Sequence, residues 1–481
     1  MAKKTINKEL TGAQDLYNFL FEACNIIRGP VSQDNFKDYI TPLLYYKRIS
    51  DVYDEETEEA LISSGGDKEY ASLPEQHRFV IPDGCHWQEV RERTENLGAA
   101  IVGAMRQIEI ANPDTLYGVL SMFSSQKWTN KAILNDSKIR DLIEHLSKRK
   151  LGNKDYPADL MGDAYEILLK KFADDSKAQA GEFYTPRSVV RLLVHILDPQ
   201  PGETVYDPAC GSGGMLIEAI RYMHDDSLCC GSIFGQEKNV VNAAIAKMNL
   251  FLHGASDFNV MQGDTLRDPK ILQGGNIAKF DCVIANPPFS LENWGATEWS
   301  SDKYKRNIYG TPSDSCGDYA WIQHMICSMS SGKGRMAVVM PQGILFRGNQ
   351  EAEIRKQLVE SDLIEAVVTL GDKLFYGTGL SPCFLIIRRM KQAHHSGRIL
   401  MIDGSKILTQ KRAQNILEEN DIDRLYSLYQ NYSDEEDYSR IVTLQEIRDK
   451  EYNLSPNRYV VYHKEEIRPY AEVLAEFKQA Y

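Results

Sequence analysis

Short runs of β-forming residues alternate with amphipathic helical segments between about Tyr165 and Met401, and this alternation limits the fold more than any other feature. The expected strands are Thr204 to Tyr206, Ile233 to Gly235, Val260 to Gln262, Cys282 to Ala285, Met336 to Met340, Glu365 to Leu370 and Cys383 to Arg388. The expected helices are Arg187 to Leu197, Met215 to Met223, Val240 to Leu252, Tyr319 to Met329 and Glu351 to Glu360. Such alternation is typical of βαβ units around a mostly parallel sheet, so we expect a doubly wound α/β domain.

Helical patterns flank this α/β region. Apolar residues at helical spacing run from about Thr11 to Asp155, where the basic cluster Lys148-Arg149-Lys150 marks a boundary. Near the C-terminus the chain returns to polar helical segments such as Ala413 to Asn420 and Glu465 to Ala480. We therefore predict an N-terminal helical domain over 1–155, the α/β domain over 156–406 and a C-terminal helical region over 407–481.

The composition narrows the classes of function. With 55 basic and 68 acidic residues the net charge is −13, which opposes approach to a polyanion unless a local basic patch or a partner chain helps. The nine cysteines contain no Cys-x-x-Cys pair, so we expect reduced thiols and no metal site. No apolar stretch approaches the roughly 18 residues of a membrane span, and Met1 to Ile6 leads into polar sequence. We expect a cytoplasmic protein without membrane association.

A glycine-rich turn is the first of two motifs that point to chemistry. It reads Asp207-Pro208-Ala209-Cys210-Gly211-Ser212-Gly213-Gly214 and joins an expected strand to an expected helix. Glycines let backbone amides approach a ligand closely, and a helix N-terminus favours polar or anionic groups. Alone the turn is a weak signal, because plain packing geometry explains it equally, and it lacks the spacing of dinucleotide- and phosphate-binding loops.

Two acidic residues, Glu237 and Asp264, fall near the ends of the next two expected strands. A carboxylate at the end of the second strand is well placed to accept both hydroxyl groups of a ribose. Taken alone, each residue is equally explained as a helix cap.

The second motif is Asn286-Pro287-Pro288-Phe289, at the end of an apolar β-run. Two prolines fix the backbone and remove amide donors, so the Asn286 side-chain oxygen and the Pro287 carbonyl become fixed acceptors. Two acceptors on the hydrogens of an aromatic amino group would return electron density to its nitrogen, and Phe289 offers a face on which an extruded base can stack. A double proline also simply ends a strand, but the succession of motifs at the ends of parallel strands favours a ligand site.

This pair of motifs resembles that of AdoMet-dependent amino-methyltransferases that act on adenine in DNA. Gly181-Glu182-Phe183-Tyr184-Thr185-Pro186-Arg187 ahead of it, and Asn453 to Tyr459 near the C-terminus, resemble segments of the modification (methylation) subunits of type I restriction-modification systems. The likeness covers essentially the whole chain. It implies a Rossmann-like methyltransferase domain between helical flanks, of which the C-terminal one docks on a specificity subunit. It also implies direct transfer from S-adenosyl-L-methionine (AdoMet) to the adenine amino group, without a metal or a covalent enzyme intermediate.

The resemblance also implies residue roles. The catalytic residues would be Asn286, Pro287, Pro288 and Phe289. The methionine end of AdoMet would be lined by Glu182, Phe183, Tyr184, Thr185, Pro186 and Arg187. Its amino-acid and ribose region would be held by Asp207, Ala209, Gly211, Ser212, Gly213 and Gly214, its ribose hydroxyls by Glu237, and its adenine by Asp264 with Thr265 and Leu266.

The loop from Asp302 to Tyr309 mixes cations and aromatic residues beyond the second motif. From it we expect Lys303, Lys305 and Arg306 to contact DNA phosphates, and a solvated surface loop is the alternative.

The partners follow from what the chain lacks. About 75 polar residues follow Lys406, too few for a recognition domain, and no Walker A pattern occurs. We therefore expect a separate specificity subunit to select the site on double-stranded DNA, together with a restriction subunit, and the resemblance implies two copies of this chain per specificity subunit. Two alternatives remain open: methylation of a glutamine amide in protein, which the same tetrapeptide serves, and a non-catalytic scaffold that senses AdoMet.

Overall fold

The structure is a computed structural model, and it describes residues 2–116, 118–120, 125–157, 160–162, 164–165, 167–168, 185–223, 231–255, 257–375, 381–411 and 414–463. Within these ranges every helix is either too short or too polar to cross a membrane.

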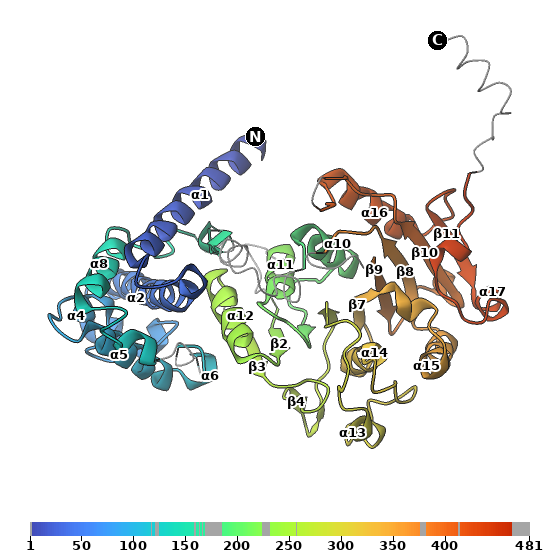
Figure 1. Cartoon of the computed structure of the whole chain (residues 1–481), viewed down its shortest axis with the longest axis horizontal. Coiled ribbons are helices and arrows are strands. Elements are labelled where there is room, and N and C mark those ends of the chain that lie inside the picture. The colour runs from blue at the N-terminus through green and yellow to red at the C-terminus, as the bar shows by residue number, and fades with distance from the viewer. Residues whose placement is uncertain are drawn as a thin grey trace, which may run out of the picture.

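One large sheet forms the centre of the α/β part (Figure 1). Its nine described strands lie in the order β11-β10-β8-β9-β7-β6-β1-β2-β3. They are β1 (Val205–Asp207), β2 (Ile233–Glu237), β3 (Phe258–Gln262), β6 (Cys282–Ala285), β7 (Arg335–Pro341), β8 (Ile364–Leu370), β9 (Pro382–Arg388), β10 (Arg398–Gly404) and β11 (Ser439–Thr443). Neighbours are parallel, except that β9 is antiparallel to β7 and β8, and β11 is antiparallel to β10. A separate small hairpin pairs β4 (Leu272–Gln273) with β5 (Asn276–Ile277).

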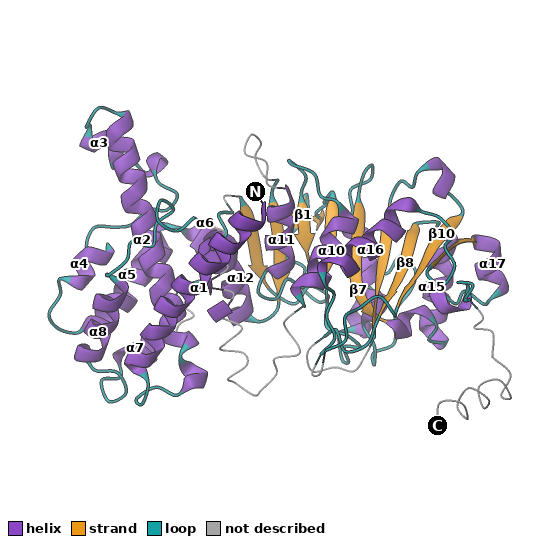
Figure 2. Cartoon of the chain, turned by 90° about the horizontal axis from the view of Figure 1, so that it is seen from above, coloured by secondary structure: helices purple, strands orange, loops and turns teal. Residues whose placement is uncertain are grey.

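Helices cover both faces of this sheet (Figure 2). Because side chains alternate along a strand, Cys282 and Ile284 join one core while Val283 and Ala285 join the other. The first core is closed by α10 (Arg187–Leu197), α11 (Gly214–Met223), α12 (Val240–Leu252) and α16 (Glu419–Asn431). The second is closed by α14 (Asp318–Ser328), α15 (Asn349–Glu360) and α17 (Leu444–Asp449). The short helices α13 (Ala296–Ser300), η3 (Gln342–Leu345), η4 (Ala393–His395) and η5 (Pro456–Arg458) lie in connections.

A helical region precedes the sheet and packs beside α12 at the β3 end (Figures 1 and 2). It contains α1 (Ala2–Ile27), η1 (Gln33–Asn35), α2 (Lys37–Ser63), α3 (Lys68–Ala71), η2 (Pro74–Gln76), α4 (Trp87–Arg91), α5 (Leu97–Ala111), α6 (Pro113–Leu116), α7 (Ser125–Thr129) and α8 (Asp136–Leu146). Phe251 of α12 enters its apolar core, with ring centroids 5.2 Å from Tyr45 and 4.9 Å from Phe79. The two parts therefore share a core at this contact.

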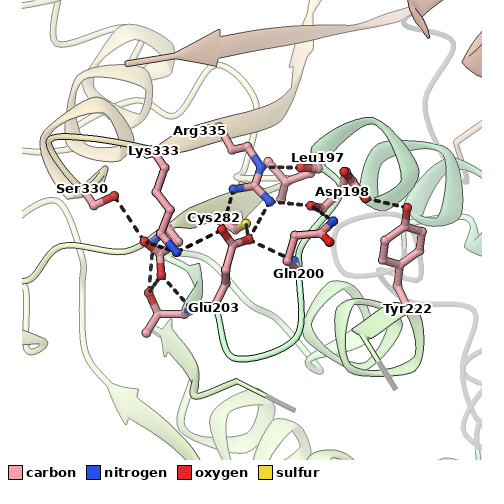
Figure 3. A network of polar contacts seen from close by, with 11 residues as sticks. Leu197, Asp198, Gln200, Glu203, Tyr222, Cys282, Ser330, Lys333 and Arg335 are labelled. Carbon is pink, nitrogen blue, oxygen red and sulfur yellow. Dashed lines mark hydrogen bonds and ion pairs between the residues drawn. The ribbon is translucent and has the colours of Figure 1, made fainter. Parts of the chain in front are cut away.

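A buried ion pair ties several elements together at the amino ends of the strands (Figure 3). Arg335, the first residue of β7, donates to the carboxylate of Glu203 at 2.6 and 3.2 Å. The same guanidinium donates to the carbonyls of Leu197, at 2.6 Å, and Asp198, beyond the end of α10. Lys333 lies 3.3 Å from Glu203 at the solvent side.

All seven expected strands and all five expected helices are present, with bounds within two residues of the prediction. The C-terminal region is partly helical, with α16 and α17, but neither helix lies where a helix was predicted. The region also adds β11 to the sheet, and neither β11 nor β10 was expected. The predicted helix from Ala413 to Asn420 is wrong, because Ile416 forms a bridge with Thr409 and α16 begins only at Glu419. The predicted helix from Glu465 to Ala480 lies outside the described residues.

Candidate active site

The carboxyl ends of β6, β1 and β2 lie side by side, because these three strands are parallel neighbours. Asn286 directly follows β6, Asp207 ends β1 and Glu237 ends β2. Both motifs and the first acidic residue therefore meet at one edge of the sheet, where open α/β folds bind ligands.

The glycine-rich turn from Asp207 to Gly214 uses backbone conformations that glycine favours. Gly211 and Gly213 have φ angles of 54° and 85°. The carbonyl of Ser212 accepts a hydrogen bond of 2.8 Å from the Asn249 side chain, which ties the turn to α12. Because α11 begins at the last glycine of the turn, the turn presents backbone and a helix N-terminus at the same edge.

Asp207 and Glu237 are carboxyl groups that accept hydrogen bonds from backbone amides of this edge. Asp207 accepts one of 2.9 Å from Ala209, and Glu237 accepts one of 3.0 Å from Gly211 and one of 2.7 Å from Asn239. Burial and, to a lesser extent, the charge of Glu237 raise the pKa of Asp207 to about 8, against the lowering effect of the Ala209 amide. Burial also raises the pKa of Glu237. Two buried acidic groups beside the glycine-rich turn favour a positively charged ligand there.

Asp264, Thr265 and Leu266 follow β3 and differ in their access to a ligand. Asp264 is partly exposed and lies 2.9 Å from the Nζ of Lys238. Thr265 and Leu266 are only 2% and 4% exposed, and the carbonyl of each accepts a hydrogen bond of 2.8 Å from Arg306. Asp264 thus offers a side chain to a ligand, whereas Thr265 and Leu266 shape the turn that carries it.

The Asn286 side chain is held by one end only. Its Nδ2 donates a hydrogen bond of 2.8 Å to the hydroxyl of Thr185. Its Oδ1 is buried and has no hydrogen-bond partner among the described residues. Phe289 is partly exposed, and its ring lies 6.5 Å from that of Phe375 at a tilt of 54°. The tetrapeptide therefore contains an acceptor without a partner, the Oδ1 of Asn286, and a partly exposed aromatic ring, Phe289, which packs against Phe375.

The segment expected at the methionine end of AdoMet is described only in part. Glu182, Phe183 and Tyr184 lie outside the described residues, Pro186 precedes α10 and Arg187 is its first residue. Thr185 contacts Asn286, so this segment reaches the same edge of the sheet as the tetrapeptide.

The loop expected to bind DNA contains one residue that faces inward. Lys303 and Lys305 are exposed, but Arg306 is 1% exposed and pairs with Asp302 at 2.7 Å. Its guanidinium also lies 4.5 Å from the Trp299 ring centroid. Since its donors are bound within the protein, Arg306 is not available for the predicted phosphate contact in this structure. The two lysines remain candidates.

A buried polar network that the sequence did not indicate joins α14, β1 and the loop that contains Arg306. The Nδ1 of His324 accepts a hydrogen bond of 3.2 Å from Arg306, and its Nε2 lies 3.1 Å from the hydroxyl of Tyr206. Burial first, and then the Arg306 charge, holds the pKa of His324 well below its usual value, so the ring is neutral. Asp302 and Arg306 are four residues apart, but they lie outside any helix, so this spacing does not by itself predict their ion pair.

Two family models match this chain. Residues 156–467 match the model described as N-6 DNA Methylase, and residues 16–146 match the HsdM N-terminal domain. The first match spans more than half of the chain, so the chain belongs to the class of N-6 DNA methylases, in agreement with its fold.

Known proteins narrow this class. The MjaVII methylase subunit of a type I restriction enzyme from Methanocaldococcus jannaschii is 35% identical over 460 residues, 91% of this chain and 77% of the relative. The EcoKI methylase subunit from Escherichia coli is 27% identical over 394 residues, 78% of this chain and 67% of the relative. The crystal structure of a type I restriction-modification methyltransferase subunit from Streptococcus thermophilus matches with a TM-score of 0.79 at 26% identity, covering 94% of this chain and 100% of that one. The chain belongs to the methylase subunits of type I restriction enzymes.

Proposed function

We propose that this chain transfers the methyl group of AdoMet to the exocyclic amino group of adenine in duplex DNA, at a site that a separate specificity subunit selects. The observation that carries the proposal is the buried Oδ1 of Asn286, which has no partner while Thr185 holds the Nδ2. Leaving a buried acceptor without a donor costs about 1–3 kcal/mol. A substrate that brings an N–H donor to this atom removes that cost.

An adenine amino group fits this acceptor because it has two N–H donors and a nitrogen lone pair delocalised into the ring. The Oδ1 of Asn286 accepts one N–H and the carbonyl of Pro287 the other, which draws electron density back to the nitrogen. Bound AdoMet supplies an electrophilic methyl group on a sulfonium. Transfer would form the N–C bond as the C–S bond breaks and would place positive charge on the amino nitrogen. The Oδ1 of Asn286 and the carbonyl of Pro287 would stabilise this charge until one proton leaves to solvent.

Phe289 provides the surface on which the base rests. An adenine inside the duplex stack cannot reach Asn286, so it must leave the helix before transfer. The partly exposed ring of Phe289 offers it a stacking face, and Phe375, only 7% exposed, supports that ring from the protein side.

The cofactor half of the site fits AdoMet by charge and by shape. Asp207 and Glu237 form an acidic pair beside the glycine turn, and AdoMet carries positive charge on its sulfonium and ammonium groups. Glu237 would exchange its backbone contacts for the ribose hydroxyls, and Asp264, after the next strand, would contact the adenine.

The grip on DNA comes from a partner in this proposal. The net charge of −13 opposes a duplex, and Arg306 is buried. Lys303 and Lys305 add local phosphate contacts, while the specificity subunit holds the site and carries two copies of this chain, and a restriction subunit joins the complex.

Asn286→Ala tests the proposal directly. It removes the acceptor without touching the acidic pair, so we expect AdoMet binding to persist while methyl transfer to DNA falls by about 100-fold or more. Transfer of labelled methyl and equilibrium AdoMet binding measure the two effects, with the exposed hairpin variant Asn276→Ala as the matched control. Normal turnover in Asn286→Ala would contradict the proposal. Label in protein rather than DNA would favour the glutamine alternative, and binding without transfer by the unaltered complex would favour the sensor.

A further inference from the structure

The backbone directly after the catalytic tetrapeptide is fixed by a side chain from another element. Ser290 has a φ angle of 50°, an unusual conformation for a residue with a side chain. Its amide donates a hydrogen bond of 2.7 Å to the Oδ1 of Asp318. Asp318 is the first residue of α14, 28 positions further along the chain, and is completely buried.

Asp318 is itself held by Arg347. The guanidinium lies 2.8 Å from the Oδ2 of Asp318 and 3.1 Å from Glu351 on α15. Its second amino group lies 3.4 Å from the hydroxyl of Ser290. A buried carboxylate without a cation would be costly, and here the cation also reaches the loop that the carboxylate holds.

The surroundings of Asp318 argue against two simpler roles. An acidic residue in the first helical turn ordinarily serves its own helix, but the Oδ1 of Asp318 binds Ser290 on a different segment. Cys316, Asp318 and Glu351 are also residue types that bind metals, and their atoms converge. The Arg347 guanidinium lies against all three, at 2.9 Å from the Cys316 sulfur, so the cation of this cluster is supplied by the protein.

We propose that Asp318, held by Arg347, is a positioning residue for methyl transfer, because it fixes the backbone amide that follows Phe289. The tetrapeptide is then tied at both ends, at Asn286 by Thr185 and behind Phe289 by Asp318. The acceptor and the stacking face keep one relative position only while both ties hold. This inference rests on the proposed function of Asn286 and Phe289.

The test uses the complex of this chain with its specificity subunit and compares Asp318→Asn, Asp318→Ala and Arg347→Gln. We expect turnover at saturating AdoMet and DNA to fall by about 10- to 100-fold, because small displacements of reacting groups have effects of this size. The Kd for AdoMet should stay within about twofold of the unaltered complex. Asp318→Asn should lose less than Asp318→Ala, since an amide oxygen still accepts from Ser290.

Glu203→Gln is the matched control, since it breaks another buried ion pair (Figure 3). This pair lies at the amino ends of the strands, away from Asn286 at the carboxyl end of β6. It should lower the melting temperature and leave turnover unchanged below the transition. Unchanged turnover in Asp318→Ala would overturn the inference, and if that variant does not fold, unchanged turnover in Arg347→Gln would do so. An equal loss of turnover in Glu203→Gln would overturn it too.

Asn286→Ala, measured beside these variants, separates this inference from the proposed function. If Asn286→Ala is inactive while the Asp318 variants are fully active, only the positioning role fails. If Asn286→Ala is active, the proposed function fails, and the positioning role, which rests on that function, fails too.

Discussion

Asp207 and Glu203 are carboxyl groups at opposite ends of β1, and their surroundings shift their pKa values in opposite directions. Burial raises the pKa of Asp207 to about 8, and its nearest charged neighbour is another acid, Glu237. Burial alone would raise the pKa of Glu203 as well, but hydrogen bonds from Arg335 and the Gln200 amide lower it to about 2. Asp207 is therefore suited to pair with a bound cation, whereas Glu203 is already paired with Arg335.

The raised pKa of Asp207 predicts proton release when AdoMet binds. An ordinary aspartate has a pKa of about 3.9. The folded protein without ligand therefore holds a proton that the unfolded chain has lost between pH 4 and 8, and this group lowers stability as pH rises through that window. A bound cation favours the ionised form, so binding near pH 7 should release up to about one proton and tighten toward pH 8.

Calorimetry at pH 7 in two buffers of different ionisation enthalpy measures this release. Asp207→Asn should bind AdoMet more weakly and release fewer protons than Glu237→Gln does. A binding enthalpy that does not change with the buffer would contradict the assignment of Asp207.

Candidate residues could be found in the sequence where they stand together in one short segment, and not where distant segments meet. Asn286 to Phe289 are adjacent in the chain, so they were found as a group, and their roles stay a prediction. Asp318 escaped notice because its partners, Ser290 and Arg347, lie 28 and 29 positions away. Arg306 was expected at DNA because a cation in a loop looks the same in sequence whether it faces water or the Asp302 carboxylate.

Among the elements, the buried strands were predictable, whereas the edge strand β11 was not. β6 to β9 are runs of apolar residues buried on both faces, which leaves few alternatives to a strand. β11 is a five-residue edge strand of mixed exposure, whose neighbour among the described strands is β10, and its sequence shows no clear alternation. Its formation depends on β10 being in place, which is information that a local pattern does not contain.

The ion pair at the amino ends of the strands leads to a prediction for stability. Glu203→Gln leaves Arg335 buried without its counter-charge, so the free energy of unfolding of this part should fall by about 3 kcal/mol. Because the pKa of Glu203 is lowered to about 2, its contribution is present above about pH 4.3, the value of an ordinary glutamate, and is lost as pH falls toward 2. Urea unfolding at pH 7 and pH 3 should show a large difference between variant and original at pH 7 and a smaller one at pH 3.

Lys333→Ala is the control, since this side chain is 65% exposed and should contribute no more than about 0.5 kcal/mol. Equal stability of Glu203→Gln and the original at pH 7 would show that the pair does not hold the strands together.

In the whole molecule, helix α12 connects the N-terminal helical region to the end of the sheet that carries the candidate active site. This helix follows Glu237, its residue Asn249 binds the glycine turn, and Phe251 enters the core of the N-terminal helices. The glycine-rich turn and the core of the helical region are therefore in contact with the same helix. The organisation into parts over 1–155, 156–406 and 407–481 stays a prediction, and the contribution of β11 to the sheet shows that the last part is not separate from the second.

In the proposed function this chain carries out methyl transfer, and a partner subunit selects the site on DNA. The most direct test is transfer of labelled methyl from AdoMet to duplex DNA by this chain alone and by the chain co-purified with its specificity subunit, followed by identification of the labelled nucleoside. We expect N6-methyladenine only when the specificity subunit is present. Efficient transfer by the chain alone would contradict the division of labour, and a complex that binds AdoMet and DNA but leaves adenine unlabelled would contradict the proposed reaction itself.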